Sequence, residues 1–235
     1  MATFVLIHGG IQGGWVWKRV VALLRAAGHD AYAPTLTGCG ERAHLLTRDI
    51  GLETHVQDVV NVLEYEDLHD VILVGHSYGG TVVTVVADRV RERISHLVYV
   101  DGARPLSGQS MMDSWGNDDP QAVKELDQYV QETGEGWRVV PMHPREFGVT
   151  DEDDIRWLEK MDTPHPYKSF TDPAQYDLER VESIPQTVII CIGDQQPPAE
   201  PPAWTKGKRF RTVASGHAVN VIAPKELTEL LLECL

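Results

Sequence analysis

The stretch "VILVGHSYGG", residues Val71 to Gly80, decides the fold of this chain. Its four leading apolar residues predict a buried strand, which stops abruptly at Gly75. Ser77 then stands between glycines, and an apolar segment of helical length follows directly. Such a serine is either an ordinary turn residue or a nucleophile presented at the end of a strand. The surrounding sequence distinguishes the two interpretations.

Apolar strands and helices alternate on both sides of this stretch. Near-continuous apolar strands separated by helices predict a mostly parallel sheet of roughly six strands with helices on both faces, an α/β fold. The predicted strands lie in residues 3–10, 30–38, 70–76, 95–102, 186–194 and 208–217, and the main helices in residues 15–29, 51–67, 78–90 and 224–235.

The alternation breaks in the middle of the chain, where no convincing buried strand occurs from Arg104 to about Ile184. Three tryptophans, helical segments such as "DPQAVKELDQYVQE" and proline-rich turns occupy this region instead. We therefore predict a core formed by residues 1–103 and 185–235, with residues 104–184 as a helical cap that covers one end of the sheet.

Charge and cysteine content exclude several functional classes. The 21 basic and 35 acidic residues leave a net charge of −14, which repels nucleic-acid backbones and anionic membranes. Three scattered cysteines are too few for a disulfide framework or a zinc site. No apolar segment is long enough to span a bilayer, and a strand begins almost at the first residue, so we expect no signal peptide and a cytoplasmic location.

The ends of the predicted strands carry the chemistry, because ligands of open parallel sheets bind beyond the carboxyl ends of the strands. "GHSYG" fits the G-x-S-x-G nucleophile elbow and lies between a buried strand and a buried helix, as that motif requires. Ser77 is therefore the candidate nucleophile. A serine needs a base, and His217, which follows the last strand, is the candidate. His76 is expected to point elsewhere, and His55 to lie in solvent.

A carboxylate must orient the histidine, and two are placed for it. Asp194 follows the strand just before the histidine strand, the usual position in this architecture, and is preferred. Asp101, at the end of the preceding strand, is the alternative. For the oxyanion we expect the backbone N–H of Tyr78 and that of Gly10, with Gly9 close behind.

Several of these segments resemble the α/β-hydrolase superfamily, in particular the branch of plant methylesterases, hydroxynitrile lyases and bacterial esterase relatives. The segments are "FVLIHGGIQGGWVWKRVVALLRAAGH", "LTGCGER", "VILVGHSYGG", "CIGDQQPPAEPPAW" and "VASGHAVNVIAPKEL". The resemblance implies an α/β-hydrolase fold, with Ser77, Asp194 and His217 matching the catalytic positions. The similar lyases carry threonine where this chain has Gly9 and lysine where it has Ala218, and both differences favour an esterase.

The sequence thus predicts a serine carboxylesterase that cleaves a small apolar or aromatic ester and needs no metal or cofactor. The alternatives are a lyase or other carbon–carbon bond enzyme, a biosynthetic cyclase, and, less favoured, a non-hydrolysing receptor on the same fold. We expect a small-molecule ester as partner, with no nucleic acid or membrane, and leave a homodimer open. The candidate cap residues that line the pocket are Met111, Met112, Trp115, Tyr129 and Trp137.

Overall fold

A six-stranded, entirely parallel sheet in the order β2-β1-β3-β4-β7-β8 forms the centre of the molecule. The structure is a computed structural model that describes residues 1–198 and 200–235. This sheet confirms the predicted fold class. Its strands are β1 (Thr3–Ile7), β2 (Asp30–Tyr32), β3 (Val71–His76), β4 (Ile94–Val100), β7 (Gln186–Cys191) and β8 (Arg209–Val213).

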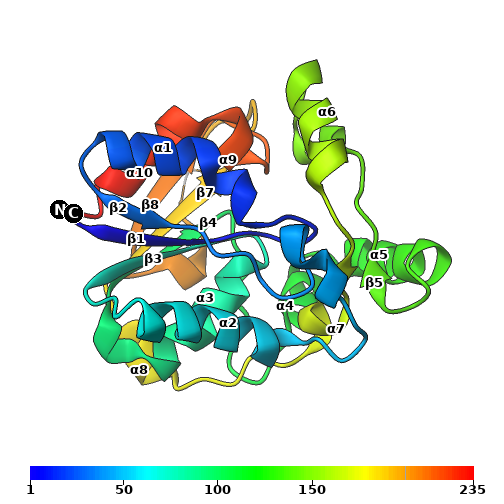
Figure 1. Cartoon of the computed structure of the whole chain (residues 1–235), viewed down its shortest axis with the longest axis horizontal. Helices are drawn as coiled ribbons and strands as arrows, with labels where there is room; N and C mark the ends of the chain where they lie inside the picture. Colours follow the sequence, from blue (N-terminus) through cyan, green and yellow to red (C-terminus); the bar gives the residue numbers. More distant parts are fainter. Residues whose placement is uncertain (199) are drawn as a thin grey trace.

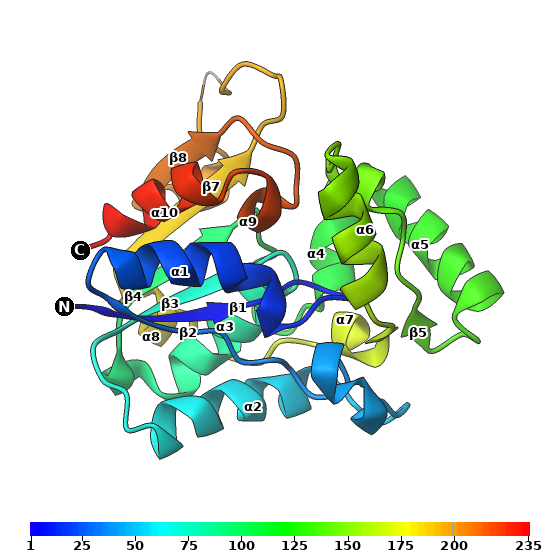
Figure 2. The ribbon, with the colours of Figure 1, turned by 45° about the horizontal axis from the view of Figure 1, so that its top comes forward.

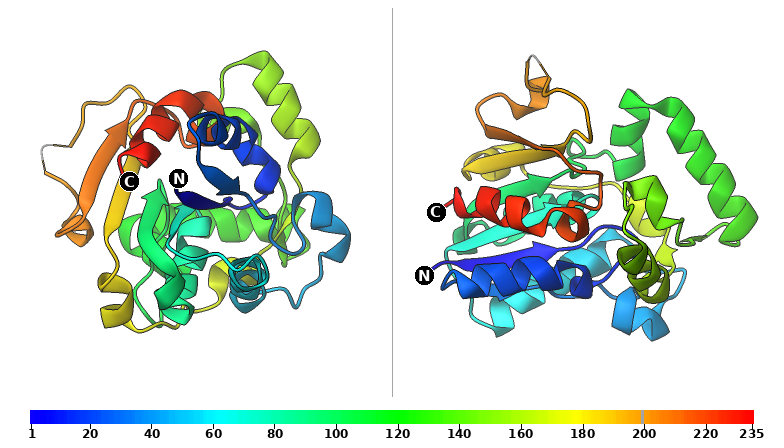
Figure 3. Two further views of the ribbon diagram at one scale, coloured as in Figure 1. Left: turned by 60° about the vertical axis from the view of Figure 1, so that its left-hand side comes forward. Right: turned by 90° about the horizontal axis from the view of Figure 1, so that it is seen from above.

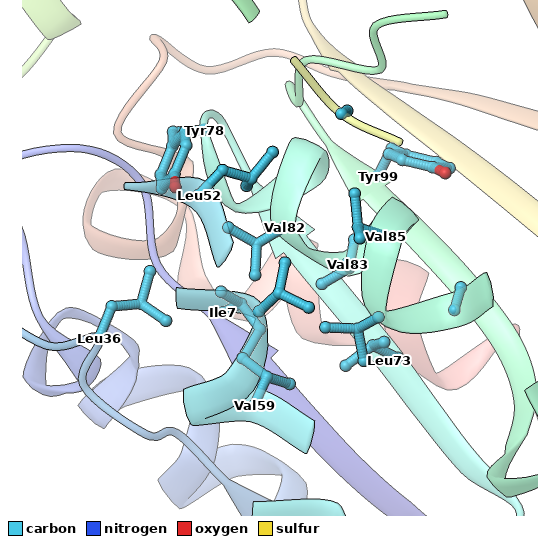
Figure 4. Close-up of a cluster of buried hydrophobic side chains, with 14 of the residues drawn as sticks. Ile7, Leu36, Leu52, Val59, Leu73, Tyr78, Val82, Val83, Val85 and Tyr99 are labelled. Carbon is cyan, nitrogen blue, oxygen red and sulfur yellow. The ribbon is translucent and has the colours of Figure 1, made fainter. Parts of the chain in front are cut away.

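Both faces of the sheet are apolar, which explains why the central strands read as continuous hydrophobic runs. Successive side chains of a strand point to opposite faces, so Ile7 and Leu73 join one core cluster whereas Leu6 and Val74 join the other. The first cluster packs under α2 (Leu52–Tyr65) and α3 (Gly79–Arg89), as Figure 4 shows in part. The second packs under α1 (Lys18–Ala26), α9 (Val219–Ile222) and α10 (Pro224–Leu232).

Figures 1 and 2 show these two helical layers on either side of the sheet, with both chain termini at the same end. Short 3₁₀ helices complete the connections: η1 (Gly14–Trp17), η2 (Gly40–Leu45), η3 (Arg91–Arg93) and η5 (Ala203–Thr205). Among the described residues, no helix combines the length and apolarity needed to cross a membrane.

Between β4 and β7 the chain leaves the sheet. Most of this excursion lies beyond the carboxyl ends of the strands, where Figures 2 and 3 show it in green to yellow. Its last helix returns to pack beside α3. The exact limits of core and cap stay a prediction. The elements of the excursion are α4 (Met111–Asp118), α5 (Pro120–Thr133), β5 (Arg138–Val139), η4 (Pro144–Phe147), α6 (Glu152–Met161), β6 (His165–Pro166), α7 (Lys168–Thr171) and α8 (Leu178–Glu182).

Candidate active site

Ser77 occupies a sharp turn between β3 and α3, with a positive φ of 54° that is costly for a residue other than glycine. The flanking glycines are sterically required. A Cβ on Gly75 would lie 2.4 Å from the carbonyl oxygen of Gly79, and a Cβ on Gly79 would lie 2.7 Å from that of Ile7. The serine is half-buried and lines the large cavity above the sheet. This is the geometry that a nucleophile elbow needs.

His217 reaches the same cavity from the loop after β8. Its Nδ1 lies 2.6 Å from Oδ2 of Asp101, which directly follows β4. The other oxygen of Asp101 accepts a hydrogen bond from the backbone N–H of Cys191 at 3.1 Å. Burial raises the pKa of Asp101, but the hydrogen bond and charge of His217, together with the Cys191 N–H, outweigh it and hold the pKa below its usual value.

The expected contact between His217 and Asp194 does not occur, and this preference is corrected. Asp194 is exposed in the turn after β7, where no described residue forms a hydrogen bond or ion pair with its carboxylate. The path of the His217 loop supplies the reason, because it brings the imidazole to the end of β4 rather than to the end of β7. β4 is the direct neighbour of the nucleophile strand, whereas β7 lies one strand further away. Ser77 N even donates to the last carbonyl of β4, that of Val100, at 3.2 Å.

Candidate oxyanion donors come from the glycine turn after β1 and from the start of α3. Gly9, Gly10 and Tyr78 all line the cavity, as expected. Within the described part of the chain, the N–H groups of Gly10 and Tyr78 donate to no other backbone carbonyl outside regular elements. His8 holds this turn, because its Nδ1 contacts the Gly9 carbonyl at 2.7 Å while its Nε2 accepts from Leu36 N at 3.0 Å. The two amides are therefore free to bind a developing negative charge.

Phe170, from α7 of the excursion, also shapes this corner of the cavity, and the sequence analysis missed it. A Cβ on Gly10 would lie 2.7 Å from its ring, and the ring centroid lies 5.0 Å from that of Tyr78. The missing side chain of Gly10 thus makes room for the cap. One aromatic residue among many in the cap carries no sequence signal of such a contact.

His55 and His76 were both wrongly predicted. His55 is fully buried, with Nδ1 2.8 Å from the hydroxyl of Tyr78 and Nε2 donating to the carbonyl of Thr37 at 3.0 Å. Burial lowers its pKa to about 4. His76 lines the cavity and contacts the backbone of His217. Position on a helix or in a turn did not reveal either contact, because both partners are distant in the sequence.

The cavity has a volume of about 830 Å³ and a mostly apolar wall. Three of the five predicted cap residues line it: Met111, Trp115 and Tyr129. The described lining does not include the other two. Met112 packs into the hydrophobic core cluster, to which Met111 also belongs, but the adjacent helix position points it away from the cavity. The guanidinium groups of Arg48 and Arg138 both lie over the ring of Trp137, at 5.3 and 5.5 Å from its centroid.

Other residues of the wall lie outside the five predicted cap residues. They come from the turn after β1, from α5 and from the segment around η4, and they include Ile11, Gln12, Glu125, Leu126, Val139, His143, Glu146 and Phe147. No lysine or arginine is among the described lining residues.

Several known esterases are similar to this chain in sequence. The chain is 54% identical over 112 residues to a carbendazim-hydrolyzing esterase from Nocardioides sp. (strain SG-4G), a match covering 48% of this chain and 46% of that protein. It is 26% identical over 226 residues to methylesterase 1 of Arabidopsis thaliana, covering 86% and 81% of the two chains. The match therefore spans less than half the length of the Nocardioides esterase. The match to methylesterase 8 of Arabidopsis thaliana likewise spans 38% of that protein's length.

Similar solved structures cover the whole chain. An extracellular α/β-hydrolase from a Paenibacillus species, described as sharing homology with tobacco salicylic acid binding protein 2, is 27% identical with a TM-score of 0.84 and coverage of 100% and 99%. Polyneuridine aldehyde esterase, at 21% identity and a TM-score of 0.79 over 99% and 98% of the chains, has the same fold. The model of the alpha/beta hydrolase family matches residues 4–230. With this match and the sheet and elbow described above, the chain belongs to the α/β-hydrolase family.

Proposed function

We propose that this protein is a serine carboxylesterase in which Ser77 is the nucleophile, His217 the general base and Asp101 the orienting acid. The observation that carries the proposal is the shared cavity. The strained elbow serine and the hydrogen-bonded His217–Asp101 pair both open into it, beside the free amides of Gly10 and Tyr78. The esterases and methylesterases of similar sequence support the same activity.

The reaction follows from these positions. Nε2 of His217 takes the hydroxyl proton while Oγ of Ser77 attacks the ester carbonyl carbon. The amides of Gly10 and Tyr78 stabilise the oxyanion, and the positive end of α3 contributes to this stabilisation. The carbonyl re-forms as the alcohol leaves with the proton from His217. Water, deprotonated by the same nitrogen, then cleaves the acyl-enzyme and releases the acid. Asp101 keeps Nδ1 protonated throughout.

The substrate we propose is a small, uncharged apolar or aromatic ester. A cavity of about 830 Å³ lies within the range of small-molecule sites, and its wall is mainly apolar. No lysine or arginine of its described wall could neutralise an anionic substrate. Because one relative is named for hydrolysing carbendazim, we include that compound among the candidate substrates.

Lyase chemistry is less well supported by this site. A departing cyanide needs a cation nearby, and the residue after His217 is the buried Ala218. A receptor or cyclase would not need the nucleophile, the base and the acid together. The cytoplasmic location and the homodimer stay predictions.

A panel of short methyl and aryl esters, with carbendazim, tests the proposal on wild type and Ser77→Ala. We expect hydrolysis by wild type and a loss of roughly 10⁴-fold or more in the variant, because the acyl-enzyme can no longer form. A fluorophosphonate probe should label Ser77 alone. Equal hydrolysis by the two proteins, or labelling at another residue, would refute the assignment of the nucleophile.

A further inference from the structure

His76 stands directly before the proposed nucleophile and contacts the proposed base. Its Nε2 lies 2.8 Å from the carbonyl oxygen of His217, and the two ring centroids are 4.8 Å apart. We propose that His76 is a positioning residue, which holds the backbone of His217 in place beside Ser77 for proton transfer. This inference rests on the function proposed above, and it concerns a side chain that takes no part in the chemical steps.

The hydrogen bond defines the protonation state of the His76 ring. A carbonyl oxygen can only accept, so Nε2 carries the proton and donates it. Burial, reinforced by the nearby His217, lowers the pKa of His76 to about 3, so the ring is neutral at ordinary pH. Its Nδ1 is then unprotonated and has no hydrogen-bond partner among the described residues. The ring thus has one donor, and that donor is directed at the His217 loop.

Close packing keeps the His76 ring in place. Its exposed fraction is 2%, and Trp17 packs edge-on against it with ring centroids 6.2 Å apart. On the other side, a Cβ on Gly9 would lie 3.3 Å from Nδ1 and 3.0 Å from the Cβ of Ser77. The ring therefore fills the space between the oxyanion turn and the His217 loop. A donor enclosed in this way fixes the position of its acceptor rather than following it.

The connection between base and nucleophile is short. His76 and Ser77 are consecutive, so one hydrogen bond links the His217 backbone to the nucleophile strand. Other contacts also hold this loop: Asp101 binds the His217 ring, Ala218 N donates to the Phe147 carbonyl at 3.1 Å, and Gly193 N donates to the Ser215 carbonyl at 2.9 Å. Among the described residues, only the His76 hydrogen bond joins this loop directly to the elbow. Without it the loop can shift, and a misplacement of about 1 Å costs roughly 10²-fold in rate.

The variants His76→Gln and His76→Asn test this role. Both side chains are neutral amides, but the amide nitrogen of glutamine reaches about as far as Nε2, whereas that of asparagine reaches only about as far as Nδ1. We expect His76→Gln to keep kcat within about 5-fold of wild type. We expect His76→Asn to lose roughly 10²-fold in kcat with little change in KM, because the ring is only 2% exposed and offers the substrate almost no contact surface.

Matched substitutions of His96 provide the control. This half-buried residue of β4 also uses Nε2 for a single hydrogen bond, to Oγ1 of Thr187 at 2.8 Å, and it lies outside the cavity lining. His96→Gln and His96→Asn should alter the urea midpoint but leave kcat unchanged. The comparison separates a general loss of stability from a loss of alignment.

The assay uses an ester that wild type hydrolyses with labelling at Ser77, so a failure of the proposed function would show before any variant is made. Equal kcat in His76→Gln and His76→Asn, whether high or low, would overturn the positioning role. So would a loss of kcat that simply follows the folded fraction. If His76→Asn does not fold, His76→Gln is sufficient as a test. A loss of more than about 10-fold in the kcat of folded His76→Gln would then overturn the proposal.

Discussion

Single residues at this site act through several contacts at once, and Asp101 is the clearest case. Its backbone N–H donates to the Ile189 carbonyl at 2.7 Å, one side-chain oxygen accepts from Cys191 N, and the other meets His217. Its φ of 44° lies in the left-handed region, which the surrounding bonds stabilise. The carboxylate is therefore held in a single orientation before substrate binds, as electrostatic preorganisation requires.

Substitution of the two candidate acids distinguishes their roles. In Asp101→Asn the amide oxygen remains the only acceptor for Cys191 N–H, so the NH₂ group faces Nδ1 of His217 and forces the wrong tautomer. We expect kcat to fall about 10⁴-fold. Asp194→Asn should stay within about 3-fold of wild type, since its carboxylate contacts no described residue. The measurement is the turnover of one ester by both folded variants. A large loss in Asp194→Asn with near-normal kcat in Asp101→Asn would identify Asp194 as the orienting acid instead.

At the scale of elements, two loops cross closely where the cap meets the loop that carries His217. Gly216, just before His217, packs against Gly148 at the end of η4, which has a φ of 85°. A Cβ on Gly216 would lie 2.7 Å from the Cα of Gly148 and 2.8 Å from the carbonyl oxygen of Phe147. The cap thus supports the His217 loop through backbone contacts as well as covering the cavity.

Gly216→Ala should separate the two loops, because both clashes are with backbone atoms that cannot rotate away. We expect a loss of about 1–3 kcal/mol in the free energy of unfolding and a fall in kcat as His217 moves. Urea unfolding and turnover measure the two effects. Gly116→Ala is the control. Among the described residues, a Cβ on Gly116 in α4 would meet only Val123, at an ordinary 3.5 Å, so this variant should be more stable by about 0.5–1 kcal/mol. A Gly216→Ala variant as stable and active as wild type would show that the crossing tolerates a side chain.

At the scale of the whole molecule, several histidines are buried in the neutral form around the site. Burial is the main cause in each case, and it lowers the pKa of His8 and of His55 to about 4 and that of His76 to about 3. It also holds the pKa of His165 well below its ordinary value. Asp162 has the opposite linkage, because burial raises its pKa to about 7.

These shifts predict a loss of stability in mild acid. Below pH 6.5, the pKa of histidine in the unfolded chain, the unfolded state binds protons at these positions while the folded state keeps the histidines neutral. The free energy of unfolding therefore falls as the pH drops from 7 toward 4. Each histidine costs about 2 kcal/mol between pH 7 and pH 5. Asp162 binds a proton in the folded state over the same pH range. It therefore stabilises the folded state by about as much as one histidine destabilises it. The net change is a destabilisation of a few kcal/mol.

Urea unfolding at pH 7 and pH 5 measures this linkage. The midpoint should be lower at pH 5, and His55→Gln, which cannot titrate, should reduce the difference between the two midpoints. An equal or higher midpoint at pH 5 would mean that the buried histidines do not control the acid response.

The sequence by itself determined the sheet, the elbow and the identity of Ser77 and His217 as candidates. Buried parallel strands need continuous apolar runs, and the tight strand-to-helix turn needs glycine at positions 75 and 79. Both features depend on residues that are close together in the sequence, so local patterns predict them. The predicted strands all occur, and the two glycines serve the close approach of backbones that their spacing implied.

Only the tertiary structure decided which acid meets His217 and which cap residues face the cavity. Asp101 and Asp194 both follow strands, and the choice between them depends on strand order and on the path of the His217 loop. Met111 and Met112 are neighbours of the same type and both pack into the core, yet of the two only Met111 is among the described residues that line the cavity. Such outcomes depend on contacts between residues far apart in the chain, which local sequence patterns do not record.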